Sequence, residues 1–163
     1  MKSFIRIMFA TLFISGLLFI ASPSYAGDGD ETDEPRERKE EGAVSSGLRG
    51  PTQQVPGGGY AYAEVILSWS PLSASGKAKT GLSNDVQGTF SLCSQVVDVK
   101  KNNVSQGGAS LQCASKTAGQ SITRTKTVYG APYQATWRVD TYHGVSAAGF
   151  SWWPSLSLTH YIP

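Results

Sequence analysis

The chain has 163 residues, of which 40% are hydrophobic and 16% charged, and its formal net charge is +2 at pH 7. This length allows one domain with a core and excludes two once an N-terminal targeting segment is removed. The charge is asymmetric, because residues 27–41 hold eight acids against three bases and residues 42–163 hold nine bases against four acids. An overall balance this close to neutral gives no reason to expect a nucleic-acid partner.

The first 26 residues have the order of a secretory signal peptide. Lys2 and Arg6 precede an apolar run over residues 7–21, and a short small-residue segment ends at Ala26. This pattern predicts cleavage after Ala26 and a secreted or periplasmic protein. The apolar run is too short to span a bilayer comfortably, so an uncleaved anchor is the weaker alternative and we expect no integral membrane protein.

The next segment, residues 27–59, is predicted to be disordered. Its first part, residues 27–41, is acidic and cannot bury enough apolar surface to offset its ordering entropy. Its second part, residues 42–59, is rich in Gly and Pro and is typical of a flexible linker. The acidic part could be a solubilising tail, a mask over the basic domain or a pro-region, and the folded domain is expected over residues 60–163.

Within residues 60–163, apolar residues alternate with polar ones at the period of β-strands. A polar turn is expected over residues 76–80, and no amphipathic helix longer than two turns is expected. The fold predicted is a small antiparallel β-sandwich, with a small β-barrel as the alternative. The strand order resembles an immunoglobulin-like domain only loosely, because the Cys, Trp, Cys spacing of that family is absent. The expected strands cover residues 61–69, 86–100, 109–113, 121–129, 133–142 and 155–162.

Two cysteines, Cys93 and Cys113, follow the signal peptide. An even pair in an exported chain predicts a disulfide. Both are equally distant from Asn103, so a hairpin centred there would place them directly across from each other. The sequence therefore predicts a structural disulfide within one sheet.

A second hairpin is expected between residues 121–129 and 133–142. If residues whose numbers sum to 262 pair, Arg124 lies across from Arg138, with Lys126 nearby. Opposed like charges cost stability, so either the register slips, Asp140 and solvent screen the pair, or an anion binds there. Arg124, Lys126 and Arg138 are thus a candidate contact for an anionic cell-surface polymer.

Aromatic residues gather near the C-terminus, and Tyr142, His143, Trp152 and Trp153 are the candidate ligand contacts. Trp152 and Trp153 are adjacent, so in an extended chain they face opposite sides and only one can enter the core. An exposed tryptophan beside tyrosine and histidine suits a sugar ring, a lipid headgroup or a protein hot spot. The alternative is that an irregular loop buries both.

Catalytic and metal-binding patterns are weak. Asp140 and His143 could be joined to a serine in a hydrolase triad, but residues three apart cannot share a strand face. His143 and His160 lie in no metal-binding motif, no paired carboxylates are evident, and no metal or cofactor is expected.

The function expected is non-catalytic binding of a cell-surface polymer, a carbohydrate or a protein. The alternative is a secreted toxin or bacteriocin-like membrane-active protein, and the third possibility is a small secreted hydrolase. The oligomeric state is left open.

Overall fold

The computed structural model describes residues 44–163, and this part of the chain is built from strands. The expected signal peptide, residues 1–26, and the acidic leader up to residue 43 lie outside the described residues. Among residues 44–163, no helix is long and apolar enough to cross a membrane. The strands are β1 (Val44–Gln54), β2 (Tyr60–Ser70), β3 (Ser73–Leu82), β4 (Phe90–Lys101), β5 (Val104–Ser105), β6 (Ala109–Lys116), β7 (Ser121–Tyr129), β8 (Ala135–Ala147), β9 (Phe150–Trp152) and β10 (Ser155–Ile162).

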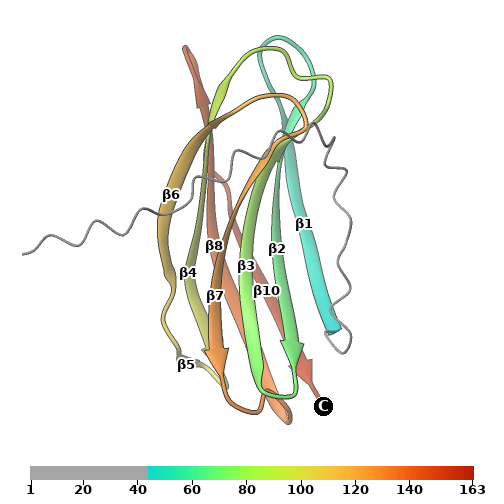
Figure 1. Cartoon of the computed structure of the whole chain (residues 1–163), viewed down its shortest axis with the longest axis vertical. Helices are drawn as coiled ribbons and strands as arrows, with labels where there is room; N and C mark the ends of the chain where they lie inside the picture. The colour runs from blue at the N-terminus through green and yellow to red at the C-terminus, as the bar shows by residue number, and fades with distance from the viewer. Residues whose placement is uncertain (1–43) are drawn as a thin grey trace, which may run out of the picture. The chain divides into compact units, whose positions relative to one another are not determined.

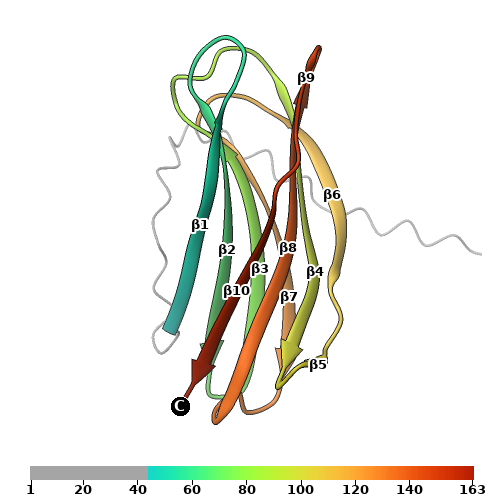
Figure 2. The ribbon, with the colours of Figure 1, turned by 180° about the vertical axis from the view of Figure 1, so that it is seen from behind.

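The strands form two antiparallel sheets that face each other (Figures 1 and 2). Sheet A has the order β1-β2-β3-β7. Sheet B has the order β10-β8-β4-β5, with β6 also paired to β4 and β9 also paired to β8. Both sheets are open at their edges, so the expected sandwich is confirmed and the alternative of a barrel is wrong.

The folded part begins earlier than expected, at β1. The prediction of a flexible linker over residues 42–59 is wrong for residues 44–54, which pair with β2 along the edge of sheet A. Almost every side chain of β1 is exposed, so the strand has no apolar alternation to reveal it. Pro51 is tolerated because it lies in a bulge of an edge strand. Gly50 lets β1 pack closely, since a Cβ there would lie 2.5 Å from Leu156 Cδ2 of β10.

A central strand, β3, stands where the sequence analysis expects a polar turn over residues 76–80, so that expectation is wrong. The residues of β3 that face the core are small, and their weak hydrophobicity hides the strand. Gly76 makes room for sheet B, because a Cβ on it would lie 2.8 Å from methyl carbons of both Val99 and Val139. The inward residues of β3 are Ala74, Gly76, Ala78, Thr80 and Leu82.

The expected hairpin between β7 and β8 is also wrong. β7 pairs with β3 in sheet A, whereas β8 pairs with β4 and β10 in sheet B. The connection over residues 130–134 carries the chain from one sheet to the other, so no register joins the two strands. The bounds expected for β7 and β10 agree with the structure, and the expected pairing of Cys93 with Cys113 is confirmed.

The core between the sheets is divided into two apolar clusters by a layer of polar side chains. On β3, for example, buried Thr80 lies between Ala78 of the first cluster and Leu82 of the second. The same order holds along β4 and β8. The first cluster includes Leu67, Trp69, Val99, Trp137 and Val139, and the second includes Leu82, Phe90, Leu92, Ile122 and Val145. The polar layer consists of Thr80, Ser94, Thr141 and His143.

Candidate functional site

The outer face of sheet B carries a pair of aromatic rings, the half-buried Tyr142 and the exposed Trp153. β8 pairs with β9 at Val145↔Trp152 and with β10 at Tyr142↔Ser155, which is one continuous register. The break between β9 and β10 is therefore not a shift in pairing, and Trp153 stands across from Gly144. We call Tyr142 and Trp153 the aromatic platform.

Trp153 lies against the backbone of Gly144. A Cβ on Gly144 would come within 2.0 Å of Trp153 Cζ3, so only glycine leaves room for the indole. Covering a strand glycine with an aromatic ring on the neighbouring strand is a known means of stabilising a sheet. The rings of Tyr142 and Trp153 are stacked, with centroids 5.7 Å apart and planes 20° apart. Trp153 nevertheless keeps 42% of its surface exposed.

A backbone hydrogen bond at the next residue, Pro154, holds Trp153 in this position. The N–H of His143 donates to the carbonyl of Pro154 over 3.0 Å. Pro154 has no N–H of its own, which suits an edge strand and explains the interruption between β9 and β10. The platform is thus fixed by a hydrogen bond, a ring stack and close contact with Gly144.

The disulfide lies beside the platform on the same face. Cys93 of β4 pairs with Gly144 on one side and with Cys113 of β6 on the other. The sulfur atoms of Cys93 and Cys113 are bonded, as the sequence analysis predicts. Leu111 and Val97 add exposed apolar surface on the neighbouring strands. Aromatic and apolar surface therefore extends over sheet B from Trp153 and Tyr142 to β6, interrupted on β4 by Gln95, which pairs with Tyr142.

Charged residues follow this surface along β4 and β8. Asp98 pairs with Asp140, and Lys100 pairs with Arg138 in the next rank. Lys100 Nζ lies 3.3 Å from one Asp140 oxygen, and Arg138 Nε lies 2.8 Å from the other. We call Asp98, Lys100, Arg138 and Asp140 the charged quartet. The expectation of no paired carboxylates is therefore wrong, because Asp98 and Asp140 are 42 positions apart in the chain and only the fold brings them together.

The carboxylate of Asp140 is held in its ionised form. Partial burial raises its pKa, but hydrogen bonds from Ser157, Arg138 and Lys100 and the positive charge of Arg138 outweigh that effect, and the pKa falls below the ordinary value of 3.8. Asp140 is therefore a fixed acceptor flanked by fixed donors.

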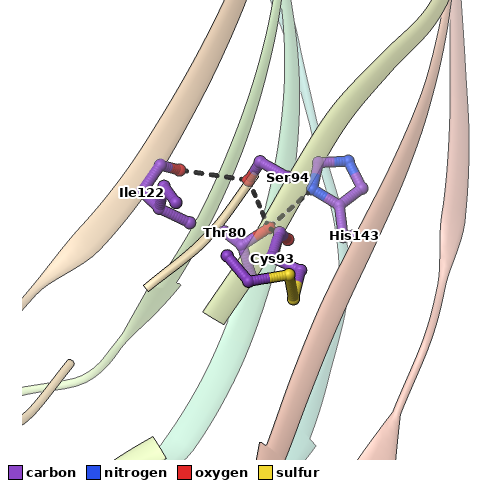
Figure 3. Close-up of a disulfide and its surroundings, with 6 residues drawn as sticks. Thr80, Cys93, Ser94, Ile122 and His143 are labelled. Atoms are coloured by element: carbon purple, nitrogen blue, oxygen red, sulfur yellow. Dashed lines mark hydrogen bonds between the residues drawn. A yellow bond between two sulfur atoms is a disulfide. The ribbon is translucent and has the colours of Figure 1, made fainter. Parts of the chain in front are cut away.

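His143 is a buried residue, so its expected role as a surface contact is wrong. It is fully covered between the sheets, in the polar layer shown in Figure 3. Its Nδ1 lies 2.9 Å from Thr80 Oγ1 and its Nε2 lies 2.8 Å from Thr141 Oγ1. Asp140 stands on the outer face. Asp140 and His143 are therefore on opposite sides of sheet B, as their spacing predicts, and cannot act together in a hydrolase triad.

The hydrogen bonds fix one tautomer of His143. Thr80 has one hydroxyl proton to donate, and two acceptors lie 2.7 Å from its Oγ1: the carbonyl of Cys93 and the Oγ of Ser94, which itself donates to the carbonyl of Ile122. Thr80 Oγ1 therefore accepts from the Nδ1–H of His143. The bare Nε2 accepts from the hydroxyl of Thr141, which lies 2.8 Å from Nε2 and 3.3 Å from the carbonyl of Leu156, so the shorter bond is the one to His143. Ser94 lies 2.7 Å from Thr80 and 3.1 Å from the carbonyl of Ile122, which ties β7 into the same layer.

Burial keeps the imidazole of His143 neutral. Loss of hydration lowers its pKa from 6.5 to about 4. His143 is therefore a polar group of the core, and both nitrogen atoms of its neutral ring are hydrogen-bonded. Its sequence neighbours Tyr142 and Gly144 both face the outside. His143 was included among the expected ligand contacts because it is next to Tyr142 in the sequence.

The remaining expected residues are separated by the fold. Trp152 is half-buried against the second core cluster, so it faces away from Trp153 as adjacent strand residues must. Arg124 does not oppose Arg138, because the two lie in different sheets. Its guanidinium instead donates to Ser110 O at 3.1 Å, joining β7 to β6. Lys126 follows Arg124 on β7, so the expected anion contact is not one cluster.

Comparison with protein-family models, with characterised proteins and with solved structures finds no match for this chain. The function is therefore argued from the geometry of the aromatic platform and the charged quartet.

Proposed function

We propose that this protein is an exported, non-catalytic binding protein that holds a polysaccharide on the outer face of sheet B. The observation that carries the proposal is the ring of Trp153, which contacts Gly144 and Tyr142 and keeps 42% of its surface exposed to solvent. A large rigid aromatic surface can bind a ligand at little cost in conformational entropy.

The order of residues along the sheet favours a sugar polymer. The platform offers ring faces to the apolar side of a pyranose, and the charged quartet begins one rank further along β8. Ranks on one face of a strand are about 7 Å apart. Asp140 accepts hydrogen bonds while Lys100 and Arg138 donate them, so the face matches hydroxyl groups that do both. An extended chain of sugars would meet these features in turn.

The opposite face of the sandwich provides a comparison. Tyr62 on β2 also stands across from a glycine, Gly81, and fills the space of its missing side chain. There, however, the guanidinium of Arg49 lies 4.8 Å from the ring centroid and the ammonium of Lys79 lies 5.5 Å from it. The aromatic ring on sheet A is occupied by cations, whereas Trp153 is open, so we place binding on sheet B.

The charged quartet supports binding rather than hydrolysis. A glycosidase of the usual kind needs one carboxylic acid whose pKa is raised so that it can donate a proton. Asp140 has a lowered pKa and is held by two cations. The predicted signal peptide and the Cys93–Cys113 bond favour action outside the cytoplasm, where disulfides persist.

Replacing Trp153 with alanine tests the proposal. Trp153→Ala is expected to weaken binding to insoluble cellulose, chitin or isolated peptidoglycan at least tenfold, because it removes the open ring while leaving both core clusters intact. Binding is measured as the fraction of protein that sediments with each polymer across a concentration series.

Tyr62→Ala is the matched control, since it removes from the other sheet an aromatic ring that also covers a strand glycine. It is expected to leave binding within about twofold, a change below roughly 0.5 kcal/mol. Equal losses in Trp153→Ala and Tyr62→Ala would contradict the assignment to sheet B, as would the absence of binding to all three polymers.

A further inference from the structure

One end of the sandwich concentrates exposed apolar side chains. This end contains the β2–β3 turn, the β4–β5 turn, the β7–β8 loop and the C-terminus, which lie together at the bottom of Figure 1. Of the eleven exposed large hydrophobic residues, six are here, so the apolar surface is gathered rather than scattered. They are Val44, Leu72, Val104, Tyr129, Tyr133 and Tyr161. We call this region the loop end.

The most prominent of these residues are held next to each other. Leu72 is 76% exposed and Tyr129 is 85% exposed. The N–H of Gly130 donates to the carbonyl of Leu72 over 2.8 Å, and Ser73 pairs with Tyr129. The two side chains therefore project from one place, at the tips of neighbouring turns.

The β7–β8 loop that follows Tyr129 is also anchored. The indole N–H of buried Trp137 donates to Pro132 O over 2.8 Å, and Lys101 Nζ donates to Ala131 O over 2.8 Å. Tyr133 in this loop is 45% exposed. The apolar tips are thus presented on a fixed frame, which lowers the entropy lost on binding.

Positive charge surrounds these tips. Lys101 lies at the loop end itself, Lys126 is three residues from Tyr129 along β7, and Lys77 is four residues from Ser73 along β3. At about 3.3 Å per residue, Lys126 and Lys77 stand about 10–13 Å behind the tips. Among residues 44–163, none of these three lysines is in a salt bridge, whereas Lys100 and Arg138 are neutralised within the charged quartet.

We propose that the loop end is a docking surface for an anionic phospholipid bilayer. Leu72, Tyr129 and Tyr133 enter the interface, where the amphipathic tyrosine ring is favoured. Lys77 and Lys126 then stand at the depth of the lipid phosphates, to which each lysine is attracted. Lys101, at the loop end itself, is held by Ala131 O and lies 5.6 Å from the Trp137 ring centroid. This surface is separate from the aromatic platform and adds a second binding activity to the one proposed above.

The same residues suit a protein partner less well. Lysine is depleted from protein interfaces, which favour a flat or concave apolar centre with charges at the rim. Here the apolar residues are at the tips of turns, and Lys77 and Lys126 stand behind them. From the tips inward, apolar side chains come first and lysines second. A membrane surface has the matching order when it is met from the hydrocarbon side, because its phosphates lie outside the hydrocarbon boundary.

Vesicle sedimentation tests the proposal with the chain from Gly27 to Pro163, so that its acidic N-terminal sequence is present. Binding is expected to vesicles of equal parts phosphatidylcholine and phosphatidylglycerol, and to be at least tenfold weaker with phosphatidylcholine alone. It is also expected to weaken at least tenfold at about 1 M salt, where the Debye length is about 3 Å.

The variant Leu72→Asp with Tyr129→Asp is expected to lose at least tenfold in vesicle binding. Both positions are so exposed that the fold is expected to be kept, which circular dichroism and thermal unfolding would verify. Leu111→Asp with Val97→Asp is the matched control, because it adds the same two charges at exposed apolar residues of sheet B, and it is expected to bind vesicles as the unaltered chain does.

The outcomes separate this proposal from the others. No binding to either vesicle would overturn it, and so would equal binding by the loop-end variant. Concentration-dependent self-association that disappears in the loop-end variant, without vesicle binding, would also overturn it by assigning the surface to a second copy. Trp153→Ala is expected to bind vesicles normally, so failure of the polysaccharide proposal leaves this test unaffected.

Discussion

Removing the disulfide is expected to lower the free energy of unfolding by about 3 kcal/mol. The variant to use is Cys93→Ala with Cys113→Ser, because Cys93 is buried and Cys113 is exposed. The bond closes a loop between residues 20 positions apart, and without it the unfolded chain gains the corresponding conformational freedom. For a domain of this size the midpoint of thermal unfolding would fall by about 10 °C.

Urea unfolding shows whether the disulfide stabilises the protein by restricting the unfolded chain. If the bond acts on the unfolded state, the slope of free energy against urea should rise in the variant, because the open chain exposes more surface. The unaltered protein with its disulfide reduced should give the same result as the variant. A loss below about 1 kcal/mol in both would contradict a structural role for the bond.

Acidification is expected to cost about 3 kcal/mol of stability through His143 alone. The pKa of its imidazole is 6.5 in the ordinary state and about 4 in the fold. Above pH 6.5 the residue is neutral in both states and the full stability is present. As the pH falls below 6.5 the unfolded chain takes up the proton first, and stability is lost until the pH passes below about 4, where the folded protein is protonated too.

The measurement is the free energy of urea unfolding between pH 7 and pH 4, compared with the same series for His143→Gln. The unaltered chain should show a slope that approaches about 1.4 kcal/mol per pH unit, and the variant should be less stable at pH 7 but nearly independent of pH in this window. His160→Gln is the matched control, because it removes the other histidine and should retain the slope. A slope that persists in His143→Gln would contradict the argument. Asp140 adds its own loss as the pH approaches and passes below its ordinary pKa of 3.8, at the acid end of this series.

The sequence predicts those parts of the fold whose apolar and polar pattern is set by residues close together in the chain. β2 and β10 alternate apolar and polar side chains because one face of each meets the core. The pairing of Cys93 with Cys113 follows from a local hairpin, where symmetry about a turn is a sound guide. The bounds of β7 are also predicted from its local pattern, although its partner strand is not.

The parts that the sequence does not predict depend on contacts between the sheets. β3 is hidden because Gly76 and its inward neighbours are small, and only the facing valines of sheet B explain them. β1 is hidden because an exposed edge strand needs no alternation. The crossing of the chain between the sheets after Tyr129 cannot be read from a symmetric register, so the pairing of Arg124 with Arg138 is wrong.

The site divides in the same way. Alternation alone predicts that Trp152 and Trp153 face opposite sides, and Trp153 is the exposed one. The place of His143 depends on Thr80, which is 63 residues away and in the other sheet. A polar side chain beside aromatic residues was expected at the surface, but the polar layer offers it hydrogen bonds inside the core.

The indole N–H signals of the four tryptophans in a nuclear magnetic resonance titration test the proposed binding most directly. The titrants are cellohexaose, chitohexaose and soluble peptidoglycan fragments. Trp153 stands on the proposed surface, whereas Trp137 is 1% exposed and hydrogen-bonded inside the core. The account predicts that at least one titrant shifts the Trp153 signal and leaves that of Trp137 in place. Shifts confined to residues of sheet A, or an unmoved Trp153 signal with all three, would contradict it.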